Sequence, residues 1–279
     1  MKWSMIAVVG VVGIFAIGGA ARADVGHFEG FESGEHSWNS YYSQLEGVAS
    51  GTGGIASSGG SYHLQITDPV SSEDHTGAYS WLGGKSATWG GGWSSSIDIY
   101  VDLNDSTIKS GTYGFHLSQS ICDTEGSPYL QDNIWHVGAV DDGNSGFEVG
   151  VNTGHNTDTT PSSRVLNPAN YHNVDYGTLA HTGWYTFETA FGPSTSTQHP
   201  DKVDVTWTLY DAAGNVVWYA NETTEHYKEE EAGGDGYLWF KTITADKLHI
   251  DNVAVVPEPA TLSLLAVAGV GVLLKRRKR

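Results

Sequence analysis

The segment SIDIYVD, residues 96–102, alternates apolar and polar side chains without a break. In a β-strand, successive side chains point to opposite faces, so Ile97, Ile99 and Val101 share one face. The other face carries Asp98, Tyr100 and Asp102. This pattern is typical of a strand that packs on one side and meets water on the other.

The same alternation recurs along most of the chain between residues 61 and 255. β-Branched or aromatic residues at period two predict strands, and Gly, Asn, Asp, Ser or Pro residues separate them. The predicted strands cover residues 61–67, 94–102, 111–120, 133–140, 146–152, 183–191, 202–210, 215–219, 236–242 and 247–255. Ten or more short strands in one domain predict an all-β fold, an antiparallel β-sandwich of two sheets packed face to face.

Four segments between or after these strands are predicted to be turns or loops. Residues 141–146 and 211–215 are clusters of turn-forming residues, which join neighbouring strands into hairpins. Residues 225–231 form either a helical turn or a solvated loop. Residues 153–175, the longest region without a clear pattern, are expected to be a surface excursion. No break in composition divides this part of the chain into two domains.

The N-terminal end reads as a targeting segment. Lys2 precedes an uncharged apolar stretch at residues 5–21, and Ala21 and Ala23 are small residues at the two positions that a signal peptidase reads. We expect cleavage between Ala23 and Asp24. The sequence therefore predicts export from the cytoplasm by the cell's export machinery.

The C-terminal end combines Pro257-Glu258-Pro259, an uncharged apolar run at residues 260–274 and five consecutive cations at 275–279. As a helix the run would span roughly 22 Å, which is short of the roughly 30 Å hydrocarbon core of a bilayer. The cations resist translocation and keep this end in the cytoplasm. We expect a marginal, transient inner-membrane anchor. A permanent single-helix anchor and a buried core helix are the alternatives, and the terminal cations disfavour the core helix.

In these last residues the chain resembles the PEP-CTERM class of bacterial sorting signals. The resemblance implies processing by an exosortase-type enzyme. It also implies delivery to the cell surface or extracellular matrix of a bacterium with a Gram-negative-type envelope. The expected organisation is then a signal peptide at residues 1–23, a β-sandwich domain at 24–255 and a sorting signal at 256–279.

The two ends of the sandwich domain resemble those of concanavalin-like jelly rolls. FESG at residues 31–34 followed by Trp38, and DNV at 251–253 in the last predicted strand, look like the ends of laminin-G-like domains and many carbohydrate-binding modules. Further segments are similar to a recurrent group of uncharacterised exported proteins that carry PEP-CTERM signals: residues 51–55 with 61–62, 97–103, 184–188 and 209–215. The resemblance implies a jelly-roll fold, and no activity comes with it.

The same resemblance implies one structural calcium ion. In such modules a carboxylate after the N-terminal Phe and the Asp of the final strand help to hold the ion, which maps onto Glu32 and Asp251, with Glu29 as a substitute. Calcium takes six to eight oxygen ligands and would pin the first segment to the last strand. The alternative is that these are turn or edge carboxylates without an ion. The histidines show no ligand-pair spacing of the zinc-site kind.

The charge of the chain excludes some partners. The net charge is −18, and between residues 24 and 256 seven Lys and Arg residues stand against 31 Asp and Glu residues, a net charge of −24. Such a domain repels nucleic acid and anionic membrane surfaces. It attracts divalent cations, or simply keeps an exported protein dispersed. Cys122 is the only cysteine, so no intramolecular disulfide forms. We interpret Cys122 as a small buried residue, with a catalytic thiol as the alternative.

Tryptophans in Gly- or Ser-rich contexts are the candidate glycan-binding residues: Trp81, Trp89 and Trp93. The segment WGGGW at residues 89–93 could present two indole faces to sugar rings. Packing against the sandwich is the alternative for each of the three. Tryptophans inside strand patterns are expected to pack in the core or on a sheet surface. They are Trp135, Trp184, Trp207 and Trp239.

No catalytic residue is predicted. The resemblance implies that a glycosidase of this fold would carry a Glu-x-Asp-x-x-Glu strand, and residues 98–102 lack both glutamates. Asp98 and Asp102 would stand roughly 13 Å apart along a strand, against roughly 5 Å for a retaining pair. We therefore expect a non-catalytic surface or extracellular-matrix protein associated with exopolysaccharide or biofilm. A calcium-stabilised carbohydrate-binding module is the alternative, followed by a glycoside hydrolase or polysaccharide lyase.

Overall fold

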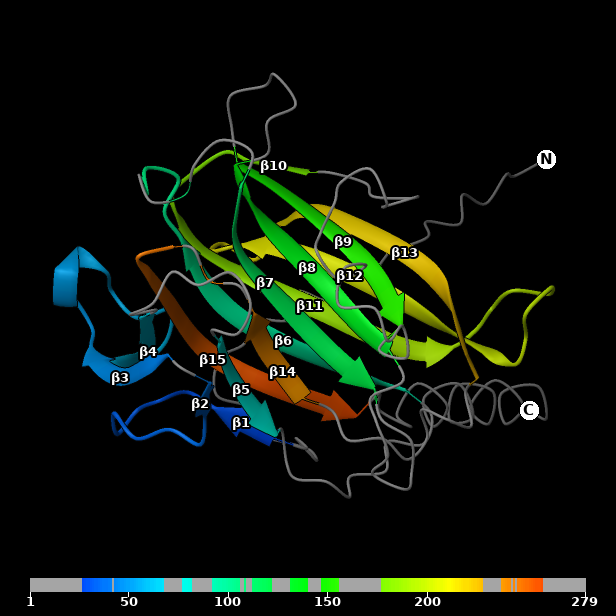
Figure 1. Ribbon diagram of the computed structural model, residues 1–279, viewed down its shortest axis with the longest axis horizontal. Coiled ribbons are helices and arrows are strands. Elements are labelled where there is room, and N and C mark those ends of the chain that lie inside the picture. The colour runs from blue at the N-terminus through cyan, green and yellow to red at the C-terminus, as the bar shows by residue number, and fades with distance from the viewer. Residues whose placement is uncertain are drawn as a thin grey trace, which may run out of the picture.

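The computed structural model of the chain describes residues 27–41, 43–67, 77–81, 92–105, 108, 112–121, 131–139, 147–155, 177–227, 237–241, 243 and 245–257 (Figure 1). The predicted signal peptide with Ala23 and Asp24 lies outside these residues, as do Trp89, Glu258, Pro259 and the apolar run after them. Within the described ranges, no helix combines the length and the apolar character that crossing a bilayer requires.

Fifteen strands and one short 3-10 helix form the regular structure of the described residues. In chain order they are β1 (His27–Glu29), β2 (Asn39–Tyr41), β3 (Gln44–Ala49), η1 (Thr52–Gly54), β4 (Tyr62–Thr67), β5 (Gly77–Trp81), β6 (Trp93–Val101), β7 (Thr112–Ile121), β8 (Gln131–Ala139), β9 (Phe147–His155), β10 (Gly177–Leu179), β11 (Gly183–Pro193), β12 (Lys202–Asp211), β13 (Val216–Tyr227), β14 (Tyr237–Lys241) and β15 (Lys247–Pro257).

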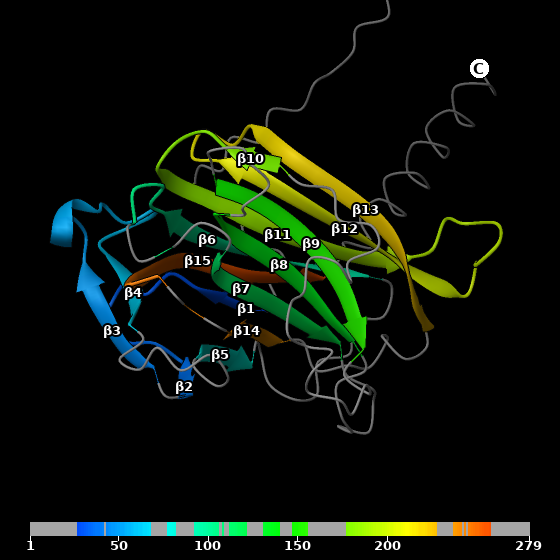
Figure 2. The same ribbon diagram turned by 45° about the horizontal axis from the view of Figure 1, so that its top comes forward.

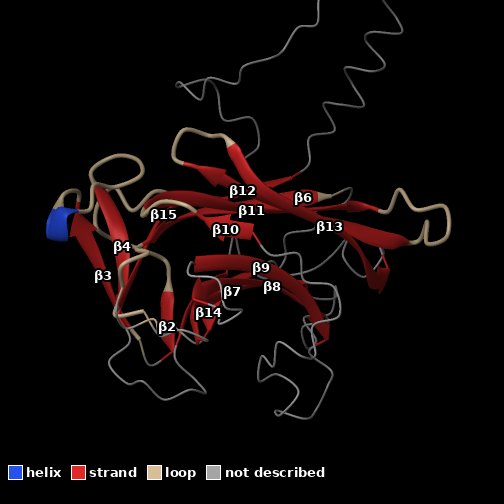
Figure 3. Cartoon of the chain, turned by 90° about the horizontal axis from the view of Figure 1, so that it is seen from above, coloured by secondary structure: helices blue, strands red, loops and turns tan. Residues whose placement is uncertain are grey.

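The strands form two sheets packed face to face, seen edge-on in Figure 3. In the eight-stranded sheet, called the first sheet below, the order is β13-β12-β11-β6-β15-β4-β3, and β1 also pairs with β15. In the seven-stranded second sheet the order is β10-β9-β8-β7-β14-β5-β2. Each of these pairings is antiparallel. The predicted antiparallel β-sandwich is confirmed.

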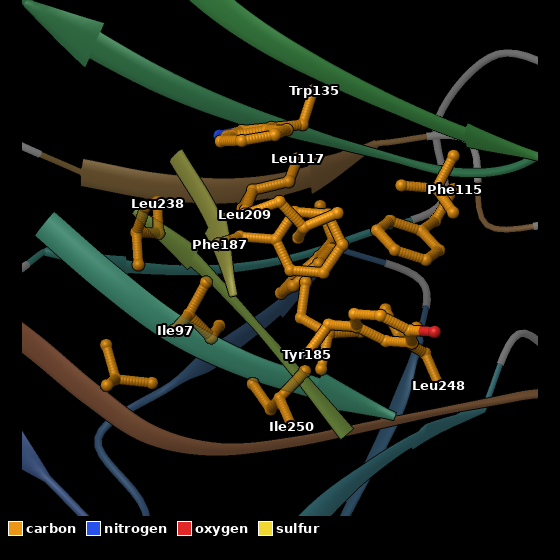
Figure 4. Packing of buried hydrophobic residues seen from close by; sticks show 14 of the residues in the cluster. Ile97, Phe115, Leu117, Trp135, Tyr185, Phe187, Leu209, Leu238, Leu248 and Ile250 are labelled. Carbon is orange, nitrogen blue, oxygen red and sulfur yellow. The ribbon is translucent and has the colours of Figure 1, made fainter. Parts of the chain in front are cut away.

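The core lies between the two sheets and takes one face of each long strand. Ile97 of β6 and Phe187 of β11 are fully buried, and Trp135 of β8 meets the Phe187 ring edge-on from the second sheet at 5.1 Å between centroids (Figure 4). The indole Nε1–H of Trp135 donates to the hydroxyl of Thr189 at 2.9 Å. Each such side chain contributes about 1.5–3 kcal/mol through burial. Period-two alternation therefore selects the core face correctly.

All ten predicted strands are present, and the turn at residues 211–215 closes the β12–β13 hairpin. Their ends differ from the predicted ones by at most three residues, except that β13 runs eight residues past the predicted end at 219. Five strands were not predicted, because they are short or interrupted by Gly and Ser residues: β1, β2, β3, β5 and β10. The prediction of a helical turn or loop at residues 225–231 is wrong for 225–227, where β13 continues along β12. Residues 153–155 of the predicted surface excursion belong to β9.

The first and last strands of the sandwich lie side by side in the first sheet (Figure 2). β4 pairs with β15 at residues 247–250, and β1 pairs with β15 at residues 253–255. Between these two partners, the pairing of β15 with β6 is irregular, and Asn252 adopts a left-handed φ of 46°. Asp251 and Asn252 therefore lie where one edge of β15 changes partner, a place called the β1–β4 seam below.

Candidate functional site

The outer face of the first sheet, turned away from the core, carries a row of polar and aromatic side chains beside the β1–β4 seam. The row crosses four adjacent strands and comprises His63 on β4, His249 and Asp251 on β15, Asp98 and Tyr100 on β6, and Trp184 and Thr186 on β11. Asp98 lies opposite Asp251 in register, and Tyr100 lies opposite both His249 and Trp184. Strand pairing thus gathers groups from distant parts of the sequence.

Residues 56–61, which lead into β4, lie against this row and are held there by hydrogen bonds. The bonds join Trp184 Nε1 to the Ala56 carbonyl (2.7 Å), Ser57 Oγ to His63 Nδ1 (3.1 Å), Ser58 Oγ to Asp98 (2.6 Å), Gly59 N to Asp251 (3.0 Å) and Ser61 N to Glu32 (2.9 Å). An irregular segment that packs on a sheet needs partners for its backbone N–H groups. Carboxylates supply two of them here.

Asp98 lies beneath this loop and is only 8% exposed. Its carboxylate accepts hydrogen bonds from Ser58 Oγ, from Asn252 Nδ2 at 2.9 Å and from Thr186 Oγ1. The prediction that this face of residues 96–102 meets water is therefore wrong at Asp98, because residues 56–61 fold back over it. Asp102, at the end of the strand, is exposed.

The structure brings two of the three predicted calcium ligands to the same loop. Asp251 has no exposed surface and accepts from the backbone N–H groups of Gly59 and Asn252. Burial raises the pKa of Asp251 to about 6; those two hydrogen bonds oppose the rise, and the charges of Asp98 and Glu32 add to it. Glu32 is exposed and accepts from Ser61.

Glu29 makes a different set of contacts. Its carboxylate accepts from the backbone N–H and the hydroxyl of Ser37 at 2.6 and 2.7 Å, and it lies 3.8 Å from His27 Nε2. Burial acts to raise the pKa of Glu29, but these partners outweigh it and hold the pKa below its usual value. Among the described residues, no group of three or more His, Cys, Asp or Glu side chains is placed to hold a metal ion.

Two histidines continue the row as a hydrogen-bonded chain. His63 Nε2 and His249 Nδ1 are 2.9 Å apart, and His63 Nδ1 contacts Ser57 Oγ. Burial lowers the pKa of His63, and burial together with the neighbouring His63 and Lys247 charges lowers the pKa of His249 to about 4. Both rings are therefore neutral near pH 7. Of the two facing nitrogens, His63 Nε2 and His249 Nδ1, one carries the hydrogen and donates it to the other.

A cleft of about 340 Å³, called the end cleft below, opens at the end of the sandwich next to His249. The β6 end, the turn after it and the start of β15 supply its polar lining, which includes Tyr100, Asp102, Asn104, Asp105, Asp246 and Lys247. Its apolar lining includes Phe115, Val137 and Leu248 between the sheets. Three carboxylates and one ammonium group give it an excess of negative charge.

The structure assigns Trp93 to packing. Its side chain is 4% exposed and stacks on Phe191 with ring centroids 4.3 Å apart. The hypothesis that Trp93 binds a glycan is therefore not supported, because neighbouring side chains cover the indole. Trp81 ends β5 opposite Tyr237. Pro257 ends β15 opposite Trp93, so the predicted sorting signal at 256–279 would begin on the last strand.

Asp98, the two histidines and the loop at residues 56–61 were not predicted as parts of a site. One available signal was the pair of glycines in the segment SSGGS, residues 57–61. Gly60 has a φ of +61°, which favours glycine, and a Cβ there would lie 1.5 Å from Glu32 Oε1, so the Glu32 carboxylate would have to move. The glycines indicate a close backbone contact, but they do not identify the group that is contacted.

Comparison with known proteins supports the fold. The chain is similar to the PL-14 alginate lyase of Aplysia kurodai, with 9% identity over 85% of this chain and 100% of that chain and a TM-score of 0.51. It is also similar to the CBM2 module of the evolved Dit of Lactobacillus casei BL23 phage J-1, with 9% identity over 84% and 96% and a TM-score of 0.47. At such identities the likeness concerns the fold alone. The alginate lyase, with the TM-score above 0.5, is the match that supports the fold.

The sequence comparisons concern the C-terminal end. No protein with a curated description matches the chain. The profile of the PEP-CTERM protein-sorting motif matches residues 255–278. That match starts on β15, the last strand of the sandwich. The chain is therefore a jelly-roll β-sandwich protein that ends in a PEP-CTERM sorting motif, the mark of an exported protein.

Proposed function

We propose that this protein is a non-catalytic component of the bacterial cell surface or of an extracellular matrix rich in exopolysaccharide. The observation that carries the proposal is the sorting motif at residues 255–278, which indicates exosortase-type processing. Val255, Val256 and Pro257 still pair with β6, so the motif match overlaps only the last three residues of β15. A processing enzyme that cuts after β15 would release the sandwich domain without breaking its last strand.

The contacts of the strand carboxylates support a non-catalytic role. Asp98 and Asp251 each accept several hydrogen bonds from loop and strand donors, and Glu188 accepts one from the Tyr210 hydroxyl at 3.2 Å. A general acid, base or nucleophile must reach a proton or a reacting atom of the substrate. These carboxylates hold parts of the protein together instead.

The test follows the fate of the C-terminal segment in a host that has an exosortase-type enzyme. The native chain is expected in the surface or matrix fraction in a shortened form. A variant with alanine at Pro257, Glu258 and Pro259 is expected to stay uncut in the inner membrane. Asp201→Ala, a change within the sandwich domain, serves as the control and is expected to be sorted normally. Native chain found uncut in the cytoplasm would overturn the proposal.

A calcium-stabilised carbohydrate-binding module is the second candidate. Asp251 and Glu32 accept hydrogen bonds from the backbone N–H groups of Gly59 and Ser61, in one loop. The negative charges of these two carboxylates add to that of Asp98 at the β1–β4 seam. A cation there would offset this negative charge. We expect millimolar calcium to raise the melting temperature, EDTA to reverse the rise, and Glu32→Gln to remove it. An identical melting temperature with calcium and with EDTA would exclude the ion.

A further inference from the structure

The end cleft has the size and the lining of a small-molecule site. Its volume of about 340 Å³ falls within the range of roughly 300–1,000 Å³ that ligand pockets occupy. Phe115, Val137 and Leu248 give it apolar surface, and polar side chains from the end of the first sheet stand beside them. Apolar surface combined with a few polar groups suits a ligand that has both C–H faces and hydrogen-bonding groups.

His249 brings an adaptable hydrogen-bonding group to the cleft. Its Nδ1 is engaged by His63, and its Nε2 makes no hydrogen bond with any residue that the structure describes. Because the ring belongs to the chain Ser57–His63–His249, the protons of that chain can be arranged in either direction. One arrangement leaves an N–H at Nε2 and the other a lone pair. A hydroxyl group, which both donates and accepts, is matched by either.

Tyr100 lines the cleft next to His249 and is held by aromatic contacts. Its ring meets Trp184 edge-on at 5.6 Å and His249 at 6.3 Å between centroids. Its hydroxyl forms no hydrogen bond within the described part of the chain. The ring is fixed by its neighbours while the hydroxyl is available, so Tyr100 offers a second preorganised group to a ligand.

The charge of the cleft selects among ligands. Asp102, Asp105 and Asp246 face only one cation of the lining, Lys247. Carboxylates accept hydrogen bonds from sugar hydroxyls and attract amines, whereas a ligand with its own acid groups is repelled. This excess of negative charge acts together with the net charge of −24 between residues 24 and 256.

We propose that the end cleft binds a polysaccharide unit that carries no acid group, either a neutral hexose or an amino sugar. The proposal rests on the second candidate function, that the sandwich contacts polysaccharide, and it places the contact in the end cleft. His249 and Tyr100 bind hydroxyl groups, the carboxylates accept from hydroxyl or ammonium groups, and the apolar lining packs against a C–H face of the sugar.

The test titrates the full chain, produced with its export signals and purified in mild detergent, with three panels of hexasaccharides: neutral, amino-sugar and uronate. We expect saturable binding within the neutral or amino-sugar panel and at least about tenfold weaker binding of every uronate at low salt. Tyr100→Phe is expected to weaken the best ligand about fivefold. Asp246→Lys is expected to strengthen uronate binding about tenfold.

Asp201→Lys is the matched control. It makes the same charge change beyond the end of β11 at Pro193, whereas the cleft lies at the opposite end of that strand near Val101. It is expected to change no affinity by more than about twofold. If both cleft variants leave neutral and amino-sugar binding unchanged, the end cleft is not the binding site, and the second candidate function still stands. Binding of uronates alone would overturn the proposed ligand class and leave the second candidate function. Binding of no panel would overturn both, and the sorting experiment would be unaffected by either result.

Discussion

Replacing Asp98 by alanine tests whether a buried carboxylate holds residues 56–61 on the outer face of the first sheet. The substitution removes the acceptor for three donors from three different segments: Ser58, Thr186 and Asn252. The strand itself keeps its pairing with β11 and β15, because those bonds involve only the backbone. The measured effect therefore reports on the carboxylate.

The size of the effect follows from these contacts. A hydrogen bond to a charged group is worth about 1.5–3 kcal/mol, and the low end applies because Ser58 is exposed and the other two donors are partly exposed. Three bonds at this low end give about 4.5 kcal/mol. Relief of the repulsion between Asp98 and Asp251 returns about 1 kcal/mol. We expect a net loss of about 3–4 kcal/mol in the free energy of unfolding.

Urea unfolding at neutral pH, followed by tryptophan fluorescence, measures this loss. It corresponds to a drop in melting temperature of about 2–4 °C per kcal/mol for a domain of this size. Asp201→Ala removes an aspartate for which the structure gives no hydrogen bond to any described residue, and it is expected to change stability by less than about 0.5 kcal/mol. If Asp98→Ala is no more destabilising than this control, the carboxylate does not hold the loop.

Three other predictions concern the core, the loop and acidity. Thr189→Val leaves the buried Trp135 N–H without its acceptor and is expected to lower the free energy of unfolding by about 1–3 kcal/mol, measured by urea unfolding. In a Trp135→Phe background, which has no indole N–H, the same substitution is expected to cost less. An equal cost in both backgrounds would show that the lost hydrogen bond is not the cause. Gly60→Ala is expected to lower the melting temperature more than Gly53→Ala does, because both glycines have left-handed φ values but only Gly60 meets Glu32; equal losses would show that the close contact is unimportant. Burial lowers the pKa values of His136 and His249 to about 3 and about 4, so the unfolded chain takes up protons first as the pH falls through 6.5, and stability is lost. Asp251 opposes this loss, because its pKa is raised from 3.8 to about 6 and the folded chain therefore takes up this proton first as the pH falls from about 6 towards 3.8. We expect a net loss of about 2–3 kcal/mol between about pH 7.5 and about pH 5, and urea unfolding that gives equal or greater stability at the lower pH would refute it.

Most long strands could be predicted because their signal is local. Alternation along residues 96–102 or 202–210 reports which face is apolar, whatever the rest of the chain does. Strands such as β1, with three residues, and β5, which reads GAYSW, contain too few alternations to be recognised. They form because neighbouring strands, β15 for β1 and β14 for β5, supply partners for their backbone groups.

The candidate site was predicted only in part. Glu32 and Asp251 were chosen by resemblance, and the structure does bring both to residues 59–61. Glu29, chosen with them, pairs with Ser37 and His27 instead. His249 and Tyr100 carried no sequence signal at all, since each occupies an ordinary polar position on a strand.

Adjacent residues were enough to specify a β-sandwich domain and its export, because alternation, an apolar run and a block of cations are properties of contiguous sequence. Tertiary structure alone decided which polar groups are buried. Asp98 accepts a hydrogen bond from Ser58, 40 residues away in the sequence, and Asp251 accepts one from Gly59, 192 residues away. Trp93 is buried where it stacks on Phe191. The order in which the strands pair brings such residues together, and no local pattern records that order.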